Sequence, residues 1–329
     1  LAWYDRARRD LPWRQSRDPY AIWIAETMLQ QTQVNTVLPD YPRFMQTFPT
    51  LRSLYRARRD KVLALWSGLG YYRRVENLKK TTHQIIREHR GKLPRDYAVL
   101  LQLPGVGPYT AGTLMSIAFH QPYPALDGNA TRVIQRLFDL DTDKTVRAAG
   151  KKLVSPHRPG QFNQALMELG SKICNPRKPS CTLCPLASVC LSGATGRIRN
   201  TTGTRRSKNI VWPMALIREN ERILLRRRTG RGILEGLWEV PGRVKMRGET
   251  LESIPTRHLK GSGYRVRVEA RIDEIRHSIT NHRIRAPLFH ASKGINFRPP
   301  ELCCRWIPIP RLHRYPLSSL SLRAIRKLD

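Results

Sequence analysis

The sequence predicts a multidomain protein with an all-α first domain and an α+β second domain. With 329 residues, the chain is long enough to bury two cores, and its 40% hydrophobic content is ordinary for a globular protein. Residues 1 to about 125 show the periodicity of consecutive short helices, whereas short apolar runs typical of strands begin at Ile210. We therefore predict a first domain over residues 1–190, a linker rich in Gly, Thr and Arg over 191–209, and a second domain over 210–329.

The composition is strongly basic, since 59 Lys and Arg against 25 Asp and Glu give a formal net charge of +34, spread along the chain. A field of that sign attracts polyanions, and nucleic acid is the partner that we expect. A membrane surface is the alternative for a basic protein, but no apolar run approaches about 20 residues and no basic amphipathic helix has a clear lipid-facing side.

The cysteine usage indicates a reducing intracellular compartment. No signal peptide is recognisable, and the adjacent Cys303 and Cys304 look like reduced, buried thiols. We expect a cytoplasmic monomer, associated with the nucleoid if bacterial. The chain opens at Leu1 rather than Met, so we expect its natural start to lie upstream.

A clear helix is predicted over residues 20–34, after a cap at Asp18 and a proline in the first helical position. Glu26 lies three residues after Trp23 and four after Ile22, so it projects from the apolar face of this helix. Desolvation favours the neutral form of a carboxyl group, which makes Glu26 a candidate general acid near neutral pH. The alternative is a structural glutamate that a neighbouring Arg or Tyr satisfies.

Two further positions have both a structural and a DNA-binding interpretation. Gln31 belongs to a polar run at the end of the predicted helix, which a soluble helix can carry as plain surface. Gly68, Gly70 and Tyr71 form a predicted tight turn before a basic helix, and an aromatic side chain on such a turn can wedge into a base stack. A core tyrosine is the alternative for Tyr71.

The run Leu103-Pro104-Gly105-Val106-Gly107 between two predicted helices, with Pro108 opening the second, is a helix-hairpin-helix signature. The backbone N–H groups of Gly105, Val106 and Gly107 can point outward at a helix N-terminus and hold a DNA phosphate without reading sequence. A purely structural turn is the alternative.

Asp127 precedes the predicted helix of residues 130–138, where an Asp is most often an N-cap. A carboxylate at the positive end of a helix keeps a low pKa and stays ionised, as is needed to face a developing cation. The sequence thus predicts one protonated carboxyl group, Glu26, and one charged one, Asp127. Acid-assisted cleavage of a glycosidic bond requires this division of labour.

Four cysteines follow the pattern C-x6-C-x2-C-x5-C, namely Cys174, Cys181, Cys184 and Cys190. Four thiolates at short fixed spacings suit either a tetrahedral zinc ion or a [4Fe-4S] cluster. Two disulfides in a secreted protein are the remaining interpretation, which the absence of a signal peptide disfavours.

Together these motifs resemble the adenine DNA glycosylases of the MutY type, within the endonuclease III or helix-hairpin-helix superfamily. The matching stretches are LPWR (11–14), ETMLQQTQV (26–34), GLGYY (68–72), LPGVGPYTAG (103–112), LDGN (126–129), FNQALMELG (162–170) and the four cysteines. The resemblance implies an all-α helix-hairpin-helix glycosylase domain with a [4Fe-4S] cluster loop over residues 174–190, followed by a degenerate Nudix-like domain. It also implies base excision repair, in which a monofunctional enzyme removes adenine mispaired with 8-oxoguanine or guanine in double-stranded DNA and leaves an abasic site.

The resemblance also implies roles for single residues. Glu26 would protonate adenine, Asp127 would stabilise the sugar cation, and Tyr109 and Asn129 complete the predicted catalytic set. Gln31 and Tyr71 would intercalate beside the extruded nucleotide. The residues implied to border the adenine pocket are Trp13, Arg14 and Gln164, and the phosphate contacts expected in the cluster loop are Arg177 and Lys178.

The main competitor within the superfamily is an endonuclease III type enzyme, which removes oxidised pyrimidines and cuts the backbone through a Schiff base. Its lysine nucleophile would lie two residues after Gly107, where this chain has Tyr109, and a phenol cannot form an imine. A non-catalytic DNA lesion binder is the other alternative. Retention of both Glu26 and Asp127 argues against it.

The second domain resembles a Nudix hydrolase that has lost its metal site. Gly248-Glu249 resembles the opening of a Nudix box, but alignment on Arg257 places His258, Gly261 and Ser262 where its glutamates belong, and these side chains cannot build a Mg²⁺ site. A pyrophosphohydrolase is therefore disfavoured.

The family senses 8-oxoguanine with a loop that commonly reads Phe-Ser-His, where this chain has Ile279, Thr280 and Asn281. Thr280 keeps a hydroxyl group, but the aromatic and histidine side chains are absent. These residues therefore leave the discrimination of 8-oxoguanine from guanine open.

Overall fold

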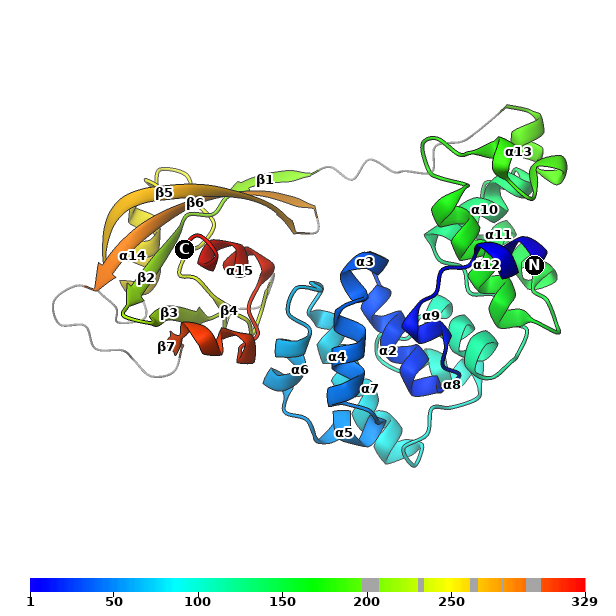
Figure 1. Ribbon diagram of the computed structural model, residues 1–329, viewed down its shortest axis with the longest axis horizontal. Helices are drawn as coiled ribbons and strands as arrows, with labels where there is room; N and C mark the ends of the chain where they lie inside the picture. Colours follow the sequence, from blue (N-terminus) through cyan, green and yellow to red (C-terminus); the bar gives the residue numbers. More distant parts are fainter. Residues whose placement is uncertain (197–206, 230–233, 261–265, 280, 294–302, 329) are drawn as a thin grey trace. The chain divides into compact units, whose positions relative to one another are not determined.

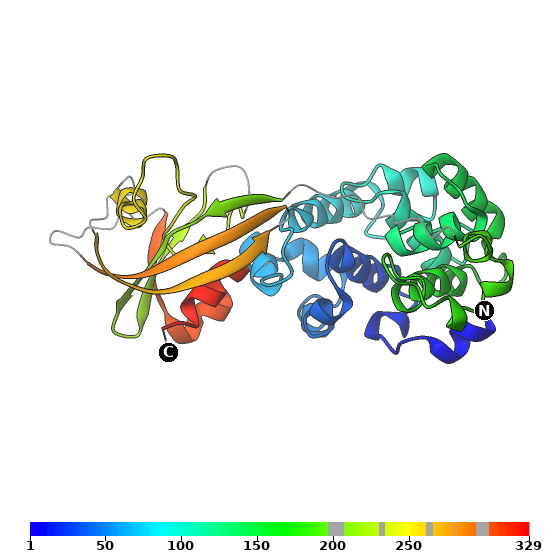
Figure 2. The same ribbon diagram turned by 90° about the horizontal axis from the view of Figure 1, so that it is seen from above.

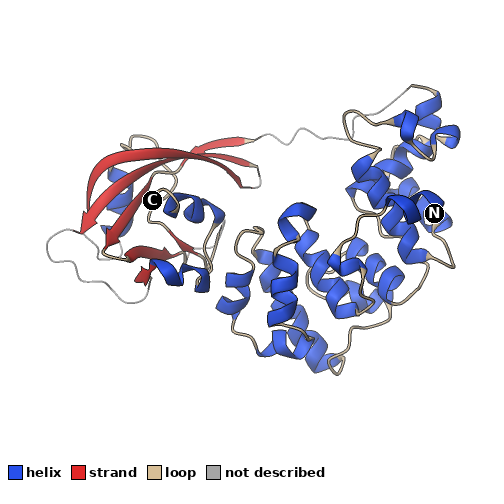
Figure 3. Cartoon of the chain, in the orientation of Figure 1, coloured by secondary structure: helices blue, strands red, loops and turns tan. Residues whose placement is uncertain are grey.

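A computed structural model describes residues 1–196, 207–229, 234–260, 266–279, 281–293 and 303–328. Backbone contacts divide the chain into two compact units. The first, called here the helical unit, comprises Leu1–Arg56 and Glu76–Gly203; the second, called the sheet unit, comprises Ala57–Val75 and Thr204–Asp329. Figure 3 shows helices throughout the first and the strands gathered in the second.

The helical unit is all-α within the described residues, as the sequence predicts. Its elements are α1 (Ala2–Ala7), η1 (Pro12–Arg14), α2 (Pro19–Leu29), α3 (Val34–Val37), α4 (Asp40–Thr47), α5 (Leu51–Arg56), most of α7 (Arg73–Glu88), α8 (Tyr97–Leu101), α9 (Pro108–Thr113), the π-helical turn η2 (Leu114–Ala118), α10 (Gly128–Phe138), α11 (Asp143–Leu153), α12 (Pro159–Lys172), η3 (Cys181–Leu183), η4 (Ala187–Val189) and α13 (Leu191–Ala194). No described helix is long and apolar enough to cross a membrane.

Helix α2 forms the centre of this unit and is buried on all sides over Tyr20–Met28. It begins as predicted, because the Asp18 side chain accepts a hydrogen bond from the Tyr20 amide and proline occupies the first helical position. The predicted end at residue 34 is wrong, since α2 stops at Leu29 and Gln31 has a left-handed φ of 58°. The polar run therefore leaves the helix as an irregular turn.

The sheet unit is a mixed sheet, with β1 and β2 parallel to β6 and the remaining pairs antiparallel. The strand order is β1-β6-β2-β3-β4, with β5 on β6 and β7 on β3. Figures 1 and 2 show β5 and β6 side by side as a long curved hairpin. The elements are α6 (Arg59–Leu65), β1 (Lys208–Val211), β2 (Met214–Glu219), β3 (Arg222–Arg227), β4 (Trp238–Glu239), α14 (Ser253–Lys260), β5 (Val266–Ile279), β6 (His282–Lys293), β7 (Cys304–Pro308), η5 (Ile309–Arg314) and α15 (Ser319–Ile325).

Alternating strand residues build an apolar core on each face of this sheet. Leu225 packs with residues of α15 on one face, whereas Leu224 packs with Leu259 of α14 on the other. The segment of residues 57–75 joins the sheet unit through tertiary contacts, because Ser67 Oγ donates to the Leu317 carbonyl at 2.7 Å.

Candidate active site

Glu26 is a buried carboxyl group with one well-defined partner. Its side chain projects from α2 into the interior, where the residue is 7% exposed, and Tyr109 Oη donates a hydrogen bond to Glu26 Oε2 at 2.6 Å. Burial raises the pKa of Glu26 to about 7, against the opposing effect of the Tyr109 hydrogen bond. The predicted burial is confirmed. A neighbouring tyrosine also satisfies the carboxyl group, but a carboxyl group with a pKa near 7 retains the properties of a general acid.

Tyr109 stays protonated throughout the accessible pH range. Burial, followed by the nearby Glu26 charge, raises the pKa of its phenol well above 10. The Tyr109 hydroxyl lies 3.8 Å from Met167 Sδ, so α12 lies beside the hydrogen-bonded pair of Glu26 and Tyr109. Met167 was not predicted from the sequence, although it follows Gln164 by three residues and so shares its helix face.

Asp127 caps α10, as the sequence predicts. The Ala130 amide donates to Oδ1 at 2.7 Å, and Asn129 Nδ2 donates to Oδ2 at 3.0 Å. The expected low pKa is wrong: burial raises the pKa of Asp127 above its usual value, and the hydrogen bonds only oppose that rise. The helix N-terminus therefore does not fully replace the stabilisation that water gives to an exposed carboxylate. The two hydrogen-bond donors still favour the charged form of Asp127.

Arg132 connects Asp127 to the first cysteine through a chain of hydrogen bonds. Its Nη2 donates to Asn129 Oδ1 at 2.8 Å, and its Nε donates to the Cys174 carbonyl at 2.8 Å. Gly170 lies against the same asparagine, because a Cβ at this position would come within 2.7 Å of Asn129. The cysteine loop and the aspartate are thus built on one packed framework.

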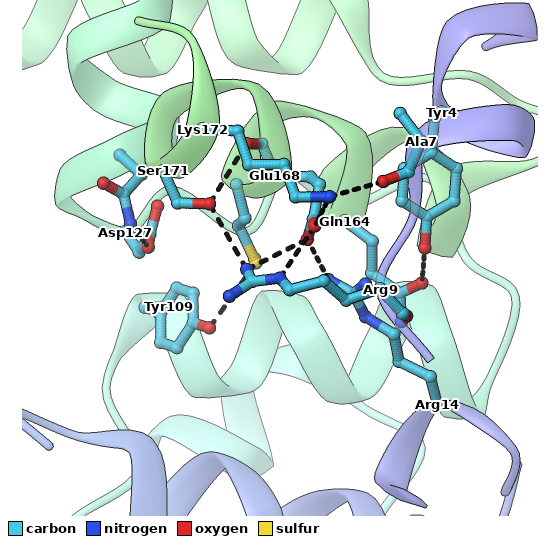
Figure 4. Close-up of polar contacts among 12 residues, drawn as sticks. Tyr4, Ala7, Arg9, Arg14, Tyr109, Asp127, Gln164, Glu168, Ser171 and Lys172 are labelled. Carbon is cyan, nitrogen blue, oxygen red and sulfur yellow. Dashed lines mark hydrogen bonds and ion pairs between the residues drawn. The ribbon is translucent and has the colours of Figure 1, made fainter. Parts of the chain in front are cut away.

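The predicted pocket residues come from η1 and α12. Trp13 is buried and packs edge-on against Tyr41, with ring centroids 5.4 Å apart. Gln164 Oε1 accepts a hydrogen bond from Tyr4 Oη at 2.6 Å, and Arg14 Nη2 donates to Glu168 at 2.8 Å. Figure 4 shows the Tyr4–Gln164 and Arg14–Glu168 contacts together with Tyr109 and Asp127.

Sequence reasoning missed Tyr4, Arg9 and Glu168, which hold these pocket residues. Glu168 follows Gln164 by four residues, so helical periodicity places both on one face of α12. Tyr4 and Arg9 carry no local signal, because their partners lie more than 150 residues away in the sequence.

Gln31 and Tyr71, the predicted intercalating residues, both have a left-handed backbone, with φ of 58° and 48°. Such a conformation costs a non-glycine residue on the order of 1–3 kcal/mol and often occurs at functional sites. Gln31 is exposed, and Tyr71 is 37% exposed. They belong to different units. Arg74 fixes the turn of Tyr71, since its Nη2 donates to the Leu69 and Gly70 carbonyls at 3.0 Å.

The predicted helix-hairpin-helix turn is present between α8 and α9. Gly105 has a φ of 79°, and a Cβ there would come within 2.8 Å of Asn77 Cβ, so both conformation and space require glycine. The Val106 amide donates to the Leu103 carbonyl at 3.0 Å, so it is engaged within the turn. Gly105 and Gly107 are therefore the amides that we retain as candidate phosphate contacts.

The four cysteines line one cavity of about 130 Å³ and are all unpaired by disulfides. Within the described residues, no group of three or more His, Cys, Asp or Glu is arranged to hold a metal ion. By their chemistry, four thiols around one cavity suit either a zinc ion or an iron–sulfur cluster. Arg136 borders the cavity, with Nη1 at 3.4 Å from Cys174 Sγ. Arg177 and Lys178 lie exposed in the same loop.

Where a Nudix box would carry a glutamate, His258 belongs to an internal hydrogen-bond network of the sheet unit. His258 Nδ1 accepts from the Gly242 amide at 3.0 Å, its Nε2 contacts Arg226, and burial followed by the nearby arginines lowers the pKa of His258 to about 3. Gly261, Ser262 and Thr280 lie outside the described residues. Ile279 and Asn281 stand at the β5–β6 hairpin end, where the Asn281 carbonyl accepts from the Lys208 amide at 2.7 Å.

A profile described as HhH-GPD superfamily base excision DNA repair protein matches residues 24–159, and a NUDIX domain profile matches residues 213–327. Among curated relatives, the adenine DNA glycosylase of Buchnera aphidicola subsp. Baizongia pistaciae is 36% identical over 252 residues, covering 73% of this chain and 72% of the relative. The adenine DNA glycosylases of Rattus norvegicus and Homo sapiens are 46% and 44% identical over 206 residues. Each of these two alignments covers 58% of this chain, but only 40% of the rat protein and 38% of the human protein.

Solved structures resemble the first part of the chain. A thermostable thymine-DNA glycosylase is 31% identical with a TM-score of 0.56, and covers 59% of this chain and 93% of its own. A non-covalent endonuclease III–DNA complex is 25% identical with a TM-score of 0.53, and covers 60% of this chain and 93% of its own. The multidomain assignment, helix-hairpin-helix glycosylase and then Nudix-like domain, is confirmed.

Proposed function

Because the chain belongs to the adenine DNA glycosylase family, we propose that it hydrolyses the N-glycosidic bond of adenine in double-stranded DNA as a base excision repair enzyme. The observation that carries the proposal is the pairing of a buried carboxyl group, Glu26, with a half-buried one, Asp127. Glu26, whose pKa is about 7, shares a hydrogen-bond network with Tyr109, and the Asp127 charge acts on both.

In this reaction Glu26 is the general acid. Protonating a ring nitrogen of adenine turns the base into a better leaving group, and a group with a pKa near 7 is well matched to proton transfer at neutral pH. General acid catalysis supplies typically ~10²–10⁴-fold. Tyr109 orients the carboxyl group through its 2.6 Å hydrogen bond and stays protonated while Glu26 cycles.

Asp127 faces the positive charge that develops on the sugar as the base leaves. Its two hydrogen bonds, from the Ala130 amide and Asn129, fix the carboxylate without neutralising it. A fixed anion at a developing cation stabilises the transition state by several kcal/mol, ~3–4 in comparable cases. Water then attacks the sugar and leaves an abasic site.

DNA is bound mainly through its backbone, as the net charge of +34 supports. The amides of Gly105 and Gly107 take one phosphate, while Arg177 and Lys178 contact others. In the sheet unit, a groove of about 780 Å³ beside the β5–β6 hairpin is lined by Arg276, Arg283, Arg285 and Arg323, which supports a second contact to the duplex.

The target adenine leaves the stack before it reacts. Gln31 and Tyr71 fill the distorted stack, while Trp13, Arg14 and Gln164 border the extruded base. No amine stands at position 109, so we propose a monofunctional enzyme that forms no Schiff base. The mispaired partner is 8-oxoguanine or guanine, and we assign Thr280 to contact it. We further propose that the protein acts as a cytoplasmic monomer.

Cys174, Cys181, Cys184 and Cys190 would hold a [4Fe-4S] cluster. The four thiolates would occupy its coordination positions, so the cluster would give the loop structural order and would not activate the substrate. Arg136 supports the same loop, because its guanidinium also donates to the Asn175 and Pro176 carbonyls, both at 2.7 Å.

The direct test is a substrate panel with purified protein. Duplexes carrying A opposite 8-oxoguanine, A opposite guanine, and an oxidised pyrimidine are assayed for base release, with and without alkali to reveal abasic sites. We expect adenine release, strand cleavage only after alkali, and no action on the pyrimidine. Release of the pyrimidine with borohydride-trappable adducts would favour an endonuclease III activity instead, and binding without release would favour a lesion binder.

A further inference from the structure

Glu168 of α12 is a fully buried carboxylate surrounded by three cations. Its side chain is 0% exposed, and both oxygens accept hydrogen bonds. Arg9 Nε donates to Oε1 at 2.7 Å and Arg14 Nη2 to Oε2 at 2.8 Å, while Lys172 Nζ lies 3.1 Å from Oε1. Figure 4 shows the cations converging on it.

The group is ionised at neutral pH. Burial alone would raise the pKa of Glu168, but the hydrogen bonds from Arg9 and Arg14 outweigh burial and lower the pKa to about 2. One negative charge thus pairs with three positive ones. Of these cations, the mostly buried Arg14 would lose most from removal of the anion, because its charge would be left unpaired in a poorly solvated place.

Arg14 is the member of this cluster that we propose to border the base pocket. Its guanidinium is held at two points, since Nη2 donates to Glu168 and Nη1 to the Arg9 carbonyl at 3.1 Å, and its side chain is only 12% exposed. Arg14 also acts electrostatically on Glu26, the proposed acid. A guanidinium so placed adds a fixed charge to the site.

Glu168 is not the only residue that attaches the N-terminal segment, residues 1–14, to α12. Arg158 at the start of α12 makes two hydrogen bonds to Asp5, at 2.6 and 3.1 Å, and Tyr4 is bonded to Gln164. The Asp5–Arg158 pair is 40% exposed on each side. Docking of the segment is therefore shared among several contacts, whereas Glu168 supplies the ion pair that orients Arg14.

We propose that Glu168 is a positioning residue for the glycosylase reaction, which fixes the Arg14 guanidinium at the base pocket beside Glu26. The inference rests on the proposed function. Glu168 touches neither base nor sugar and acts through Arg14.

Glu168→Gln tests this in single-turnover adenine release. The amide keeps the shape but removes the charge that fixes Arg14, and a displacement of about 1 Å in a positioned group can cost ~10²-fold, so we expect the rate constant to fall about 10- to 100-fold with a smaller change in DNA affinity. Asp5→Asn is the matched control. It removes an ion pair from the same segment but leaves Arg14 in place, and it should retain the wild-type rate.

The pH profile gives a readout that a merely structural role would not move. The charged and titratable groups acting on Glu26 are Tyr109, Asp127 and Arg14. Loss of the Glu168 anion leaves the Arg14 charge less compensated, which favours the Glu26 carboxylate. The limb on which activity falls with rising pH should therefore move to lower pH in Glu168→Gln, and stay in place in Asp5→Asn.

A double-mutant cycle with Arg14→Met separates the two explanations. If Glu168 acts through Arg14, Glu168→Gln adds little further loss in the Arg14→Met background. Full additivity of the two losses, or a wild-type rate and pH limb in Glu168→Gln, would overturn the inference while leaving the proposed function standing. A wild-type protein that releases no adenine refutes both. If Glu168→Gln does not fold, Glu168→Asp, which keeps the charge but shortens the reach, should give a smaller loss in the same direction.

Discussion

Replacing Tyr109 with phenylalanine removes the hydrogen bond that ties the phenol to Glu26 while keeping the ring. The bond is 2.6 Å long and buried, and it favours the charged form of the carboxyl group because Tyr109 donates it. It therefore opposes the effect of burial, which raises the pKa of Glu26 to about 7. Its loss should therefore raise the pKa of Glu26 further. A hydrogen bond to a charged group contributes about 1.5–3 kcal/mol, and each pKa unit corresponds to about 1.4 kcal/mol, so the expected rise is about one to two units.

The assay is single-turnover adenine release from an A:8-oxoguanine duplex, measured across pH for wild type and Tyr109→Phe. Glu26 must be protonated to act, so activity falls as the pH rises through its pKa. The midpoint of that limb should move from about 7 in the wild type to about 8 or above in the variant. Met167→Leu, which removes only the sulfur 3.8 Å from the phenol, should leave the midpoint in place. A midpoint that stays at 7 or falls in Tyr109→Phe would refute the assignment of Glu26 as the acid.

Two other predictions concern the framework and the DNA surface. Gly170→Ala would place a Cβ about 2.7 Å from Asn129, so urea unfolding should show a free energy of unfolding lower by about 1–3 kcal/mol. The control is Gly193→Ala, whose Cβ would meet its neighbours only at 3.6 Å and should lower the free energy of unfolding by less. Equal losses in the two variants would contradict the packing argument. Arg177→Gln and Lys178→Gln should each reduce the slope of log K against log salt for duplex binding by about 1, and unchanged slopes would remove these residues from the phosphate contacts.

Local sequence patterns predicted the parts of the site that local structure determines. The burial of Glu26 follows from its spacing to Trp23 and Ile22 within one helix, and the capping role of Asp127 follows from its place before α10. The helix-hairpin-helix turn was predictable because Gly105 permits the positive φ of the turn and Pro108 fixes the backbone at the start of α9.

The rest depended on tertiary contacts that no local pattern encodes. The rise in the pKa of Asp127 reflects how much water the fold removes, which the sequence does not state. Tyr4 meets Gln164, and Arg9 meets Glu168, across about 160 residues of sequence. The early end of α2 depends on a left-handed turn at Gln31 that helical periodicity missed.

The most direct test of the account is single-turnover adenine release by Glu26→Gln from an A:8-oxoguanine duplex. The substitution keeps the size of the side chain and a hydrogen-bonding partner for Tyr109 but removes the transferable proton. We predict a loss of about 10²-fold or more in the rate constant, with DNA affinity largely retained. Release at the wild-type rate would contradict the central claim that a buried, protonated Glu26 drives departure of the base.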